Sequence, residues 1–170
     1  HTGRTGPCTQ AIIDAGVSRV VVGTLDPDSK VSGSGVQQLR NAGLTVDVGV
    51  LEQEVKQQLA AYLHHRATGR PFVVLKMAST IDGRIAAADG SSKWITGETA
   101  RKRVHQLRAE SDAIVVGAGT VRADDPSLTV RDADGPSPRR IVLGTIDASA
   151  KVHPCTQWTG TLPDLLDTLG

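Results

Sequence analysis

Short apolar runs alternate along the chain with segments of helical periodicity. Apolar runs rich in β-branched residues and bounded by turn formers predict strands at 19–23, 44–50, 72–77, 84–88, 113–116 and 140–144. Segments with helical spacing of apolar residues, or with capping residues at their ends, predict helices at 7–15, 36–41, 51–65 and 96–110. The first strand is expected to be buried. Alternating strands and helices indicate an α/β fold with parallel sheets.

A domain boundary is predicted at 69–71, where the sequence reads Gly-Arg-Pro. Proline disfavours a helical conformation for the residue before it, and a new strand is expected directly afterwards. We therefore expect one domain at 1–68 and a second at 72–170. The chain starts at His1 inside a turn-rich segment and stops at Gly170 just after an amphipathic stretch. This suggests a fragment of a longer protein.

The composition excludes several classes of function. Aromatic residues make up only 2% of the 170 residues and the net charge is +1, so neither base stacking nor general phosphate attraction favours nucleic acid as a partner. No apolar run approaches the roughly 20 residues that a membrane helix needs. The N-terminus also lacks the apolar core of a signal peptide, so a cytoplasmic protein is expected. The two cysteines, Cys8 and Cys155, are too few for a disulfide framework.

Polar or glycine-rich turns follow the apolar runs in the second half of the chain. They lie at 78–83, 91–97, 117–120 and 124–131. In open α/β sheets, ligands bind beyond the carboxyl ends of the strands, where turns supply backbone N–H groups, hydroxyls and cations. Several such turns within about sixty residues predict a site for a phosphorylated ligand.

Single residues in these turns leave the chemistry open. The turn 117–120 precedes a helical segment, where free N–H groups attract an anion, but an ordinary tight turn fits equally well. Lys76 interrupts an apolar strand, so it either serves a function or points to solvent from an edge strand. Trp94 lies in a polar turn, where its side chain could either act as a lid on the core or form a flat wall against a ring of the ligand.

Two arginines and one cysteine are open in the same way. Arg108 lies near the C-terminus of a predicted helix, where arginine often just complements the helix dipole. Together with Arg131, it could instead bind phosphate through planar, bidentate guanidinium groups. Cys8 stands at the first turn of a helix, which favours thiolate and metal ligation, but a small buried residue fits equally well without a second ligand.

The combination resembles the bifunctional deaminase-reductase family of riboflavin biosynthesis along nearly the whole chain. The segment 1–8 is similar to the end of that family's zinc motif, Pro-Cys-x-His-x-Gly-Arg/Lys-Thr-x-Pro-Cys, and Asp26-Pro27 is similar to its Asp-Pro-Asn-Pro. The segments 75–83, 92–96 and 119–131 are similar to its reductase half. The resemblance implies the C-terminal part of a cytidine-deaminase-like three-layer domain, followed by the N-terminal part of a dihydrofolate-reductase-like domain.

The resemblance also implies an activity and its residues. The family deaminates a diaminopyrimidine phosphoribosylamine with zinc and then reduces its ribosyl group to ribityl with NADPH. The zinc ligand would be Cys8, and Lys76 would act in proton transfer. The substrate, a phosphoribosylaminopyrimidine, would contact His1, Arg4 and Asp26 in the deaminase and Ser92, Arg108, Leu128 and Arg131 in the reductase. NADPH would contact Ala78, Trp94, Thr120, Asp124 and Thr145.

The same resemblance implies a homo-oligomer in which this fragment is incomplete for both reactions. Asp28 stands where the family has asparagine. A dihydrofolate-reductase-like reductase of another heterocycle remains an alternative, as does a non-catalytic module for dimerisation or ligand sensing. A tRNA or nucleoside deaminase would account for the first domain only, because such proteins do not continue into 76–131.

Overall fold

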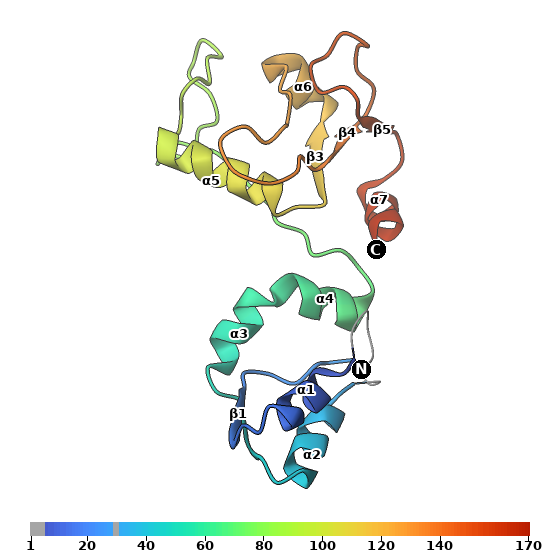
Figure 1. The fold of residues 1–170 in the computed structure, drawn as a ribbon. Helices are drawn as coiled ribbons and strands as arrows, with labels where there is room; N and C mark the ends of the chain where they lie inside the picture. Colours follow the sequence, from blue (N-terminus) through green and yellow to red (C-terminus); the bar gives the residue numbers. More distant parts are fainter. Residues whose placement is uncertain (1–5, 29–30) are drawn as a thin grey trace. The chain divides into compact units, whose positions relative to one another are not determined.

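The computed structural model describes residues 6–28 and 31–170, and the chain divides into two compact units (Figure 1). Unit 1 consists of His1–Val73 and Leu166–Gly170, and unit 2 of Val74–Leu165. Each unit has its own parallel sheet. The predicted α/β class with parallel sheets is therefore confirmed.

Unit 1 alternates helices and strands in the predicted order. Its elements are α1 Cys8–Asp14, β1 Arg19–Val22, α2 Ser34–Asn41, β2 Thr45–Val48, α3 Glu52–Gln58 and α4 Ala60–Thr68. Strands β1 and β2 pair in parallel, with Arg19 opposite Thr45 and Val22 opposite Val48. A parallel pair needs a crossover between its strands, and α2 supplies it.

Two expectations for unit 1 were wrong in detail. The strand β1 is not buried: exposed and half-buried side chains alternate along it, and Val21 is 52% exposed, because successive side chains point to opposite faces of the sheet. The helix predicted at 51–65 is divided at Leu59, which has φ −96° and ψ 13°. The N–H of Leu59 still donates to the Val55 carbonyl, and that of Leu63 to the Leu59 carbonyl, both at 2.9 Å. Hydrogen bonding thus continues through the break, so periodicity alone could not reveal it.

Unit 2 is built around a three-stranded sheet. Its elements are α5 Glu98–Ala109, β3 Ala113–Gly117, α6 Ala118–Asp124, β4 Arg139–Leu143, β5 Thr156–Trp158 and α7 Leu162–Leu169, whose last residues belong to unit 1. The strand order is β3-β4-β5, all parallel. Ile141 and Val142 of the central strand are fully buried. Apolar side chains on both faces are typical of such a strand, which is why its run was easy to recognise.

The strands predicted at 72–77 and 84–88 are wrong. Neither segment forms a strand, and their apolar side chains are exposed, Leu75 by 83% and Met77 by 69%. A strand requires a neighbour for its backbone groups, and apolar content does not tell whether that neighbour is present. Strand β5 was missed because it is only three residues long. Within 6–28 and 31–170, no helix is long and apolar enough to cross a membrane.

Candidate functional site

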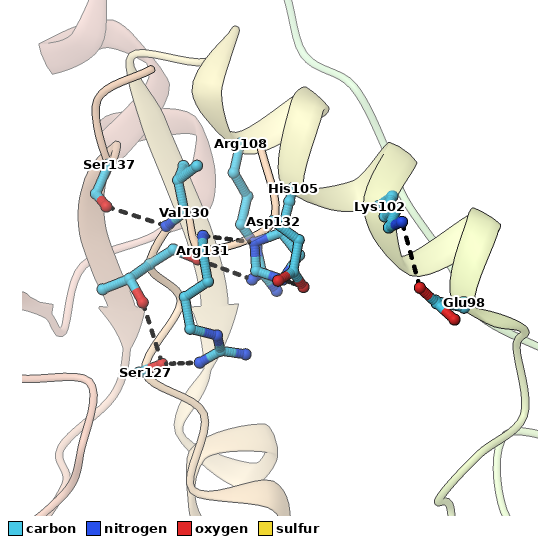
Figure 2. A network of polar contacts seen from close by, with 10 residues as sticks. Glu98, Lys102, His105, Arg108, Ser127, Val130, Arg131, Asp132 and Ser137 are labelled. Carbon is cyan, nitrogen blue, oxygen red and sulfur yellow. Dashed lines mark hydrogen bonds and ion pairs between the residues drawn. The ribbon is translucent and has the colours of Figure 1, made fainter. Parts of the chain in front are cut away.

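Residues of helix α5 and of the loop between α6 and β4, residues 125–138, form a polar network in unit 2 (Figure 2). His105 and Arg108 lie three residues apart on α5 and therefore share one face. The backbone N–H of Arg131 donates to His105 Nδ1 at 3.1 Å, and Arg108 Nη1 donates to the Thr129 carbonyl at 3.1 Å. Two neighbouring side chains of one helix thus hold two backbone positions of the loop.

The two arginines of this network carry like charges. Burial, and then the charge of Arg131, lower the pKa of the Arg108 guanidinium, which nevertheless stays charged near neutral pH. Arg108 Nε is buried and has no partner among the described residues. Arg131 Nη1 donates to Ser127 Oγ at 2.8 Å. A buried free donor beside two positive charges is an arrangement that an anion would complete.

His105 lies at the base of this network. It is 5% exposed, and it is the one buried polar or charged side chain in the described chain. Burial, and then the charge of Arg108, lower the pKa of the imidazole, with Asp132 acting in the opposite direction. The Nε2 atom lies 3.4 Å from Asp132 Oδ2. His105 was not predicted from the sequence, because nothing in its local pattern distinguishes it from a polar neighbour of the apolar stripe.

The loop that carries Arg131 has an unusual backbone. Asp125 and Leu128 have φ of 41° and 54°, a left-handed conformation that costs a residue with a Cβ roughly 1–2 kcal/mol. Asp125 Oδ1 accepts the Lys151 N–H at 2.9 Å. The Leu128 side chain is 5% exposed and packs in the core with Val142. Of Leu128, predicted as a substrate contact, only the backbone is therefore suited to touch a ligand.

Three of the five residues predicted to contact NADPH lie on α6, which follows β3, or just after β4. Since β3 and β4 are parallel neighbours, their carboxyl ends at Gly117 and Leu143 lie side by side. Thr120 and Asp124 on α6 and Thr145 after β4 are all exposed near this edge. No atom lies within 4 Å of the position that a Cβ would take on Gly117 or Gly119, so this backbone is accessible.

A separate cavity of about 410 Å³ brings together two further predicted residues, Ser92 and Trp94. Thr80 and Arg84 also line it. Trp94 is 72% exposed, and the guanidinium of Arg101 lies 4.4 Å from the centre of its ring. The indole is thus stacked on one side by a cation and is too exposed to be a core lid, and its role as a flat wall against a ligand ring stays a prediction.

Lys76 and Ala78 lie in the exposed segment that forms no strand. Lys76 is exposed and Ala78 is half-buried. The strand that Lys76 was expected to interrupt does not form, because the segment pairs with no neighbour in the described chain, and the Lys76 side chain is exposed. The role of Lys76 in proton transfer stays a prediction.

In unit 1, Asp26 lines a cavity of about 640 Å³ together with Lys56. Its Oδ2 accepts the Tyr62 hydroxyl at 2.7 Å, and Oδ1 accepts the Asp28 N–H at 2.9 Å. The hydrogen bond from Tyr62 to the carboxylate raises the pKa of Tyr62. Asp26 is therefore half-buried and oriented at the edge of a cavity large enough for a small ligand.

The metal prediction rests on Cys8, which lies exposed in the first turn of α1. Among residues 6–28 and 31–170, no group of three His, Cys, Asp or Glu side chains converges as a metal site would require. His1 and Arg4, predicted to contact the substrate, lie outside the described residues.

Known proteins are similar to this chain over most of its length. The model of the RibD C-terminal domain family matches residues 71–163. The riboflavin biosynthesis protein RibD of Aquifex aeolicus is 49% identical over 156 residues, which cover 89% of this chain and 44% of the relative. That of Mycobacterium tuberculosis strain H37Rv is 49% identical over 152 residues, covering 86% and 44%. The chain spans less than half the length of these curated relatives.

Solved structures resemble it over almost the whole chain. A diaminohydroxyphosphoribosylaminopyrimidine deaminase/5-amino-6-(5-phosphoribosylamino)uracil reductase from Thermotoga maritima superimposes with a TM-score of 0.83 at 39% identity, over 99% of this chain and 55% of that chain. Acinetobacter baumannii RibD gives a TM-score of 0.82 at 38% identity, over 99% and 56%. The mixed α/β fold is thus the fold of these structures.

Proposed function

Because the chain belongs to the RibD C-terminal domain family, we propose that it acts in riboflavin biosynthesis as part of a bifunctional deaminase and reductase. Residues 1–68 would form the C-terminal part of a cytidine-deaminase-like domain. Residues 72–170 would form the N-terminal part of a dihydrofolate-reductase-like domain. The similarity to riboflavin biosynthesis proteins and to a deaminase/reductase structure supports this proposal. A cytoplasmic location and a homo-oligomer belong to the same proposal.

The substrate of the reductase half would be a pyrimidine carrying a ribosylamine 5-phosphate. Arg108 and Arg131 would neutralise the phosphate and so fix the sugar at its far end. Binding of such a remote group orients the reacting carbon, which is how enzymes offset the entropy of positioning. The single observation that carries this assignment is the buried Arg108 Nε, which has no partner among the described residues and lies beside a second guanidinium.

The edge at the ends of β3 and β4 suits NADPH, because open glycine backbone meets exposed hydroxyls there. When bound, NADPH supplies the hydride that reduces C1 of the ribosyl group. Thr120, Asp124 and Thr145 would hold the cofactor, with Ala78 and Trp94 as further contacts. Ser92 would contact the substrate from the cavity that it shares with Trp94, and Lys76 would act in proton transfer.

For the deaminase half, Asp26 is proposed to contact the substrate from the cavity in unit 1. Cys8 is proposed as a zinc ligand, with His1 and Arg4 contacting the substrate. In the part of the chain that the structure describes, Cys8 has no cluster of further ligands. These residues alone therefore do not fit a zinc ion.

Calorimetric titration of the 170-residue chain with ribose 5-phosphate, and separately with NADPH, tests the reductase assignment. Arg131→Ala should weaken ribose 5-phosphate binding about 10-fold to 150-fold, because a hydrogen bond to a charged group contributes roughly 1.5–3 kcal/mol. NADPH binding should stay unchanged. Arg103→Ala is the matched control, since Arg103 lies on α5 and pairs with Glu110 at 3.3 Å.

Three results would contradict the assignment. The first is a wild-type chain that binds no ribose 5-phosphate. The second is an Arg131→Ala variant that loses NADPH affinity as strongly as sugar-phosphate affinity. The third is an Arg103→Ala variant that weakens sugar-phosphate binding to the same extent.

A further inference from the structure

The imidazole of His105 makes a directional contact that an apolar core residue could not make. Its Nδ1 accepts the backbone N–H of Arg131 at 3.1 Å. An imidazole nitrogen accepts a hydrogen bond only when it carries no proton, so the neutral ring holds its proton on Nε2. That side of the ring faces Asp132 Oδ2 at 3.4 Å. Both nitrogens are therefore used, and the tautomer is set by the loop (Figure 2).

The backbone that His105 holds would not keep its path without support. Asp125 and Leu128 of the loop are both in the left-handed region, and residues with a Cβ remain there only where the surroundings hold them. The described supports include the Lys151 N–H on Asp125, Arg108 on the Thr129 carbonyl, Ser137 Oγ on the Val130 N–H and His105 on the Arg131 N–H. His105 is the support that holds the backbone of Arg131 itself.

We propose that His105 is a positioning residue for phosphate-ester binding, which holds the Arg131 backbone so that the guanidinium groups of Arg108 and Arg131 act on one anion. This inference rests on the proposed sugar-phosphate site. His105 does not touch the ligand; it acts through Arg131. Because Arg108 is on the same face of α5, one helical turn sets the positions of both arginines.

The charges that surround the ring are consistent with this role. Arg108 faces it from α5, and Arg131 and Asp132 face it from the loop. A charged imidazole would lose its Nδ1 acceptor and add a third positive group beside the two arginines. A neutral ring keeps the hydrogen bond and leaves the two guanidinium groups as the positive charges of the site.

The test compares two variants of the 170-residue chain by titration with ribose 5-phosphate and with NADPH. His105→Asn retains an acceptor, because the amide oxygen of asparagine takes about the place of Nδ1. His105→Leu fills the space but accepts no hydrogen bond. We expect the leucine variant to lose about 10-fold in ribose 5-phosphate affinity and the asparagine variant less than about 3-fold, as a lost neutral hydrogen bond implies. NADPH affinity should stay unchanged in both.

The matched control is Gln106→Leu, at the neighbouring exposed position. Equal losses in the asparagine and leucine variants would overturn the inference, and so would normal binding in the leucine variant. If Arg131→Ala loses affinity while His105→Leu does not, the inference fails and the proposed function stands. If the wild-type chain does not bind ribose 5-phosphate at all, both fail.

A measurement on the wild-type chain keeps the inference testable if the leucine variant does not fold. A long-range ¹H–¹⁵N correlation spectrum reports which imidazole nitrogen carries the proton. We expect an unprotonated Nδ1 and a protonated Nε2 for His105, and a shift of the Nδ1 resonance when ribose 5-phosphate is added. A proton on Nδ1, or no response to the ligand, would overturn the inference.

Discussion

Arg108 should contribute to ligand binding without contributing to the stability of the unliganded chain. Replacing it by methionine keeps most of the aliphatic stem and removes the guanidinium. The variant loses one hydrogen bond, from Nη1 to the Thr129 carbonyl, which is worth roughly 1.5–3 kcal/mol for a charged donor. It also removes the buried Nε, which has no partner in the described part of the chain and whose desolvation costs roughly 1–3 kcal/mol.

These two effects have opposite signs and similar sizes. The free energy of unfolding without ligand should therefore change by no more than about 2 kcal/mol. Ligand binding should change much more. At a ribose 5-phosphate concentration of 100 times the wild-type Kd, the ligand stabilises the wild-type chain by about 2.7 kcal/mol, and a variant with a 100-fold weaker Kd by only about 0.4 kcal/mol.

Urea unfolding followed by tryptophan fluorescence measures both quantities. The chain has two tryptophans, Trp94 and Trp158, and both lie in unit 2, so the emission reports the unit that carries the site. Arg103→Met serves as the control on the same helix. A loss above about 3 kcal/mol without ligand would show that Arg108 is a structural tie of the loop. Full ligand stabilisation in Arg108→Met would equally refute the reasoning.

Two further predictions concern His105 and Gly144. Burial and the charge of Arg108 hold the pKa of His105 below its ordinary 6.5, so the unfolded chain binds the proton at a higher pH than the folded chain. The free energy of unfolding, measured by urea titration, should therefore fall from pH 7 to pH 5. The variant His105→Asn should flatten this pH dependence. A pH dependence unchanged in His105→Asn would contradict this assignment. Gly144 has φ 101°, and a Cβ there would lie 3.2 Å from Ala118 Cβ, so Gly144→Ala should cost about 1–3 kcal/mol in the same assay. Gly119→Ala, in open space on α6, should be neutral or stabilising, and equal losses at both glycines would refute the argument.

The sequence predicted the bounds of an element well where its backbone hydrogen bonds form within the element, or where its side chains are buried on both faces. Helix α5 was predicted within two residues at each end, since the 3.6-residue period and the hydrogen bonds of a helix are local. Strand β4 was predicted within one residue, because apolar residues on both faces mark a central parallel strand. The segments 72–77 and 84–88 show the limit, because the pairing of a strand depends on a neighbour that its own residues do not specify.

The candidate site also has features that were predicted before the structure and features that only the tertiary structure decided. The two arginines were candidates from residue type, since planar guanidinium groups bind phosphate bidentately, but their assignment to the phosphate came from the resemblance to the deaminase-reductase family. The tertiary structure decided how the two arginines and the residues around them are placed and which partners they have. It places Arg108 and Arg131 in one network and leaves Nε of Arg108 without a partner among the residues that the structure describes. It also turns Leu128 into the core and gives His105 a hydrogen bond to the loop. Burial, partner and orientation depend on how α5 packs against residues more than twenty positions later, and no local pattern contains that packing.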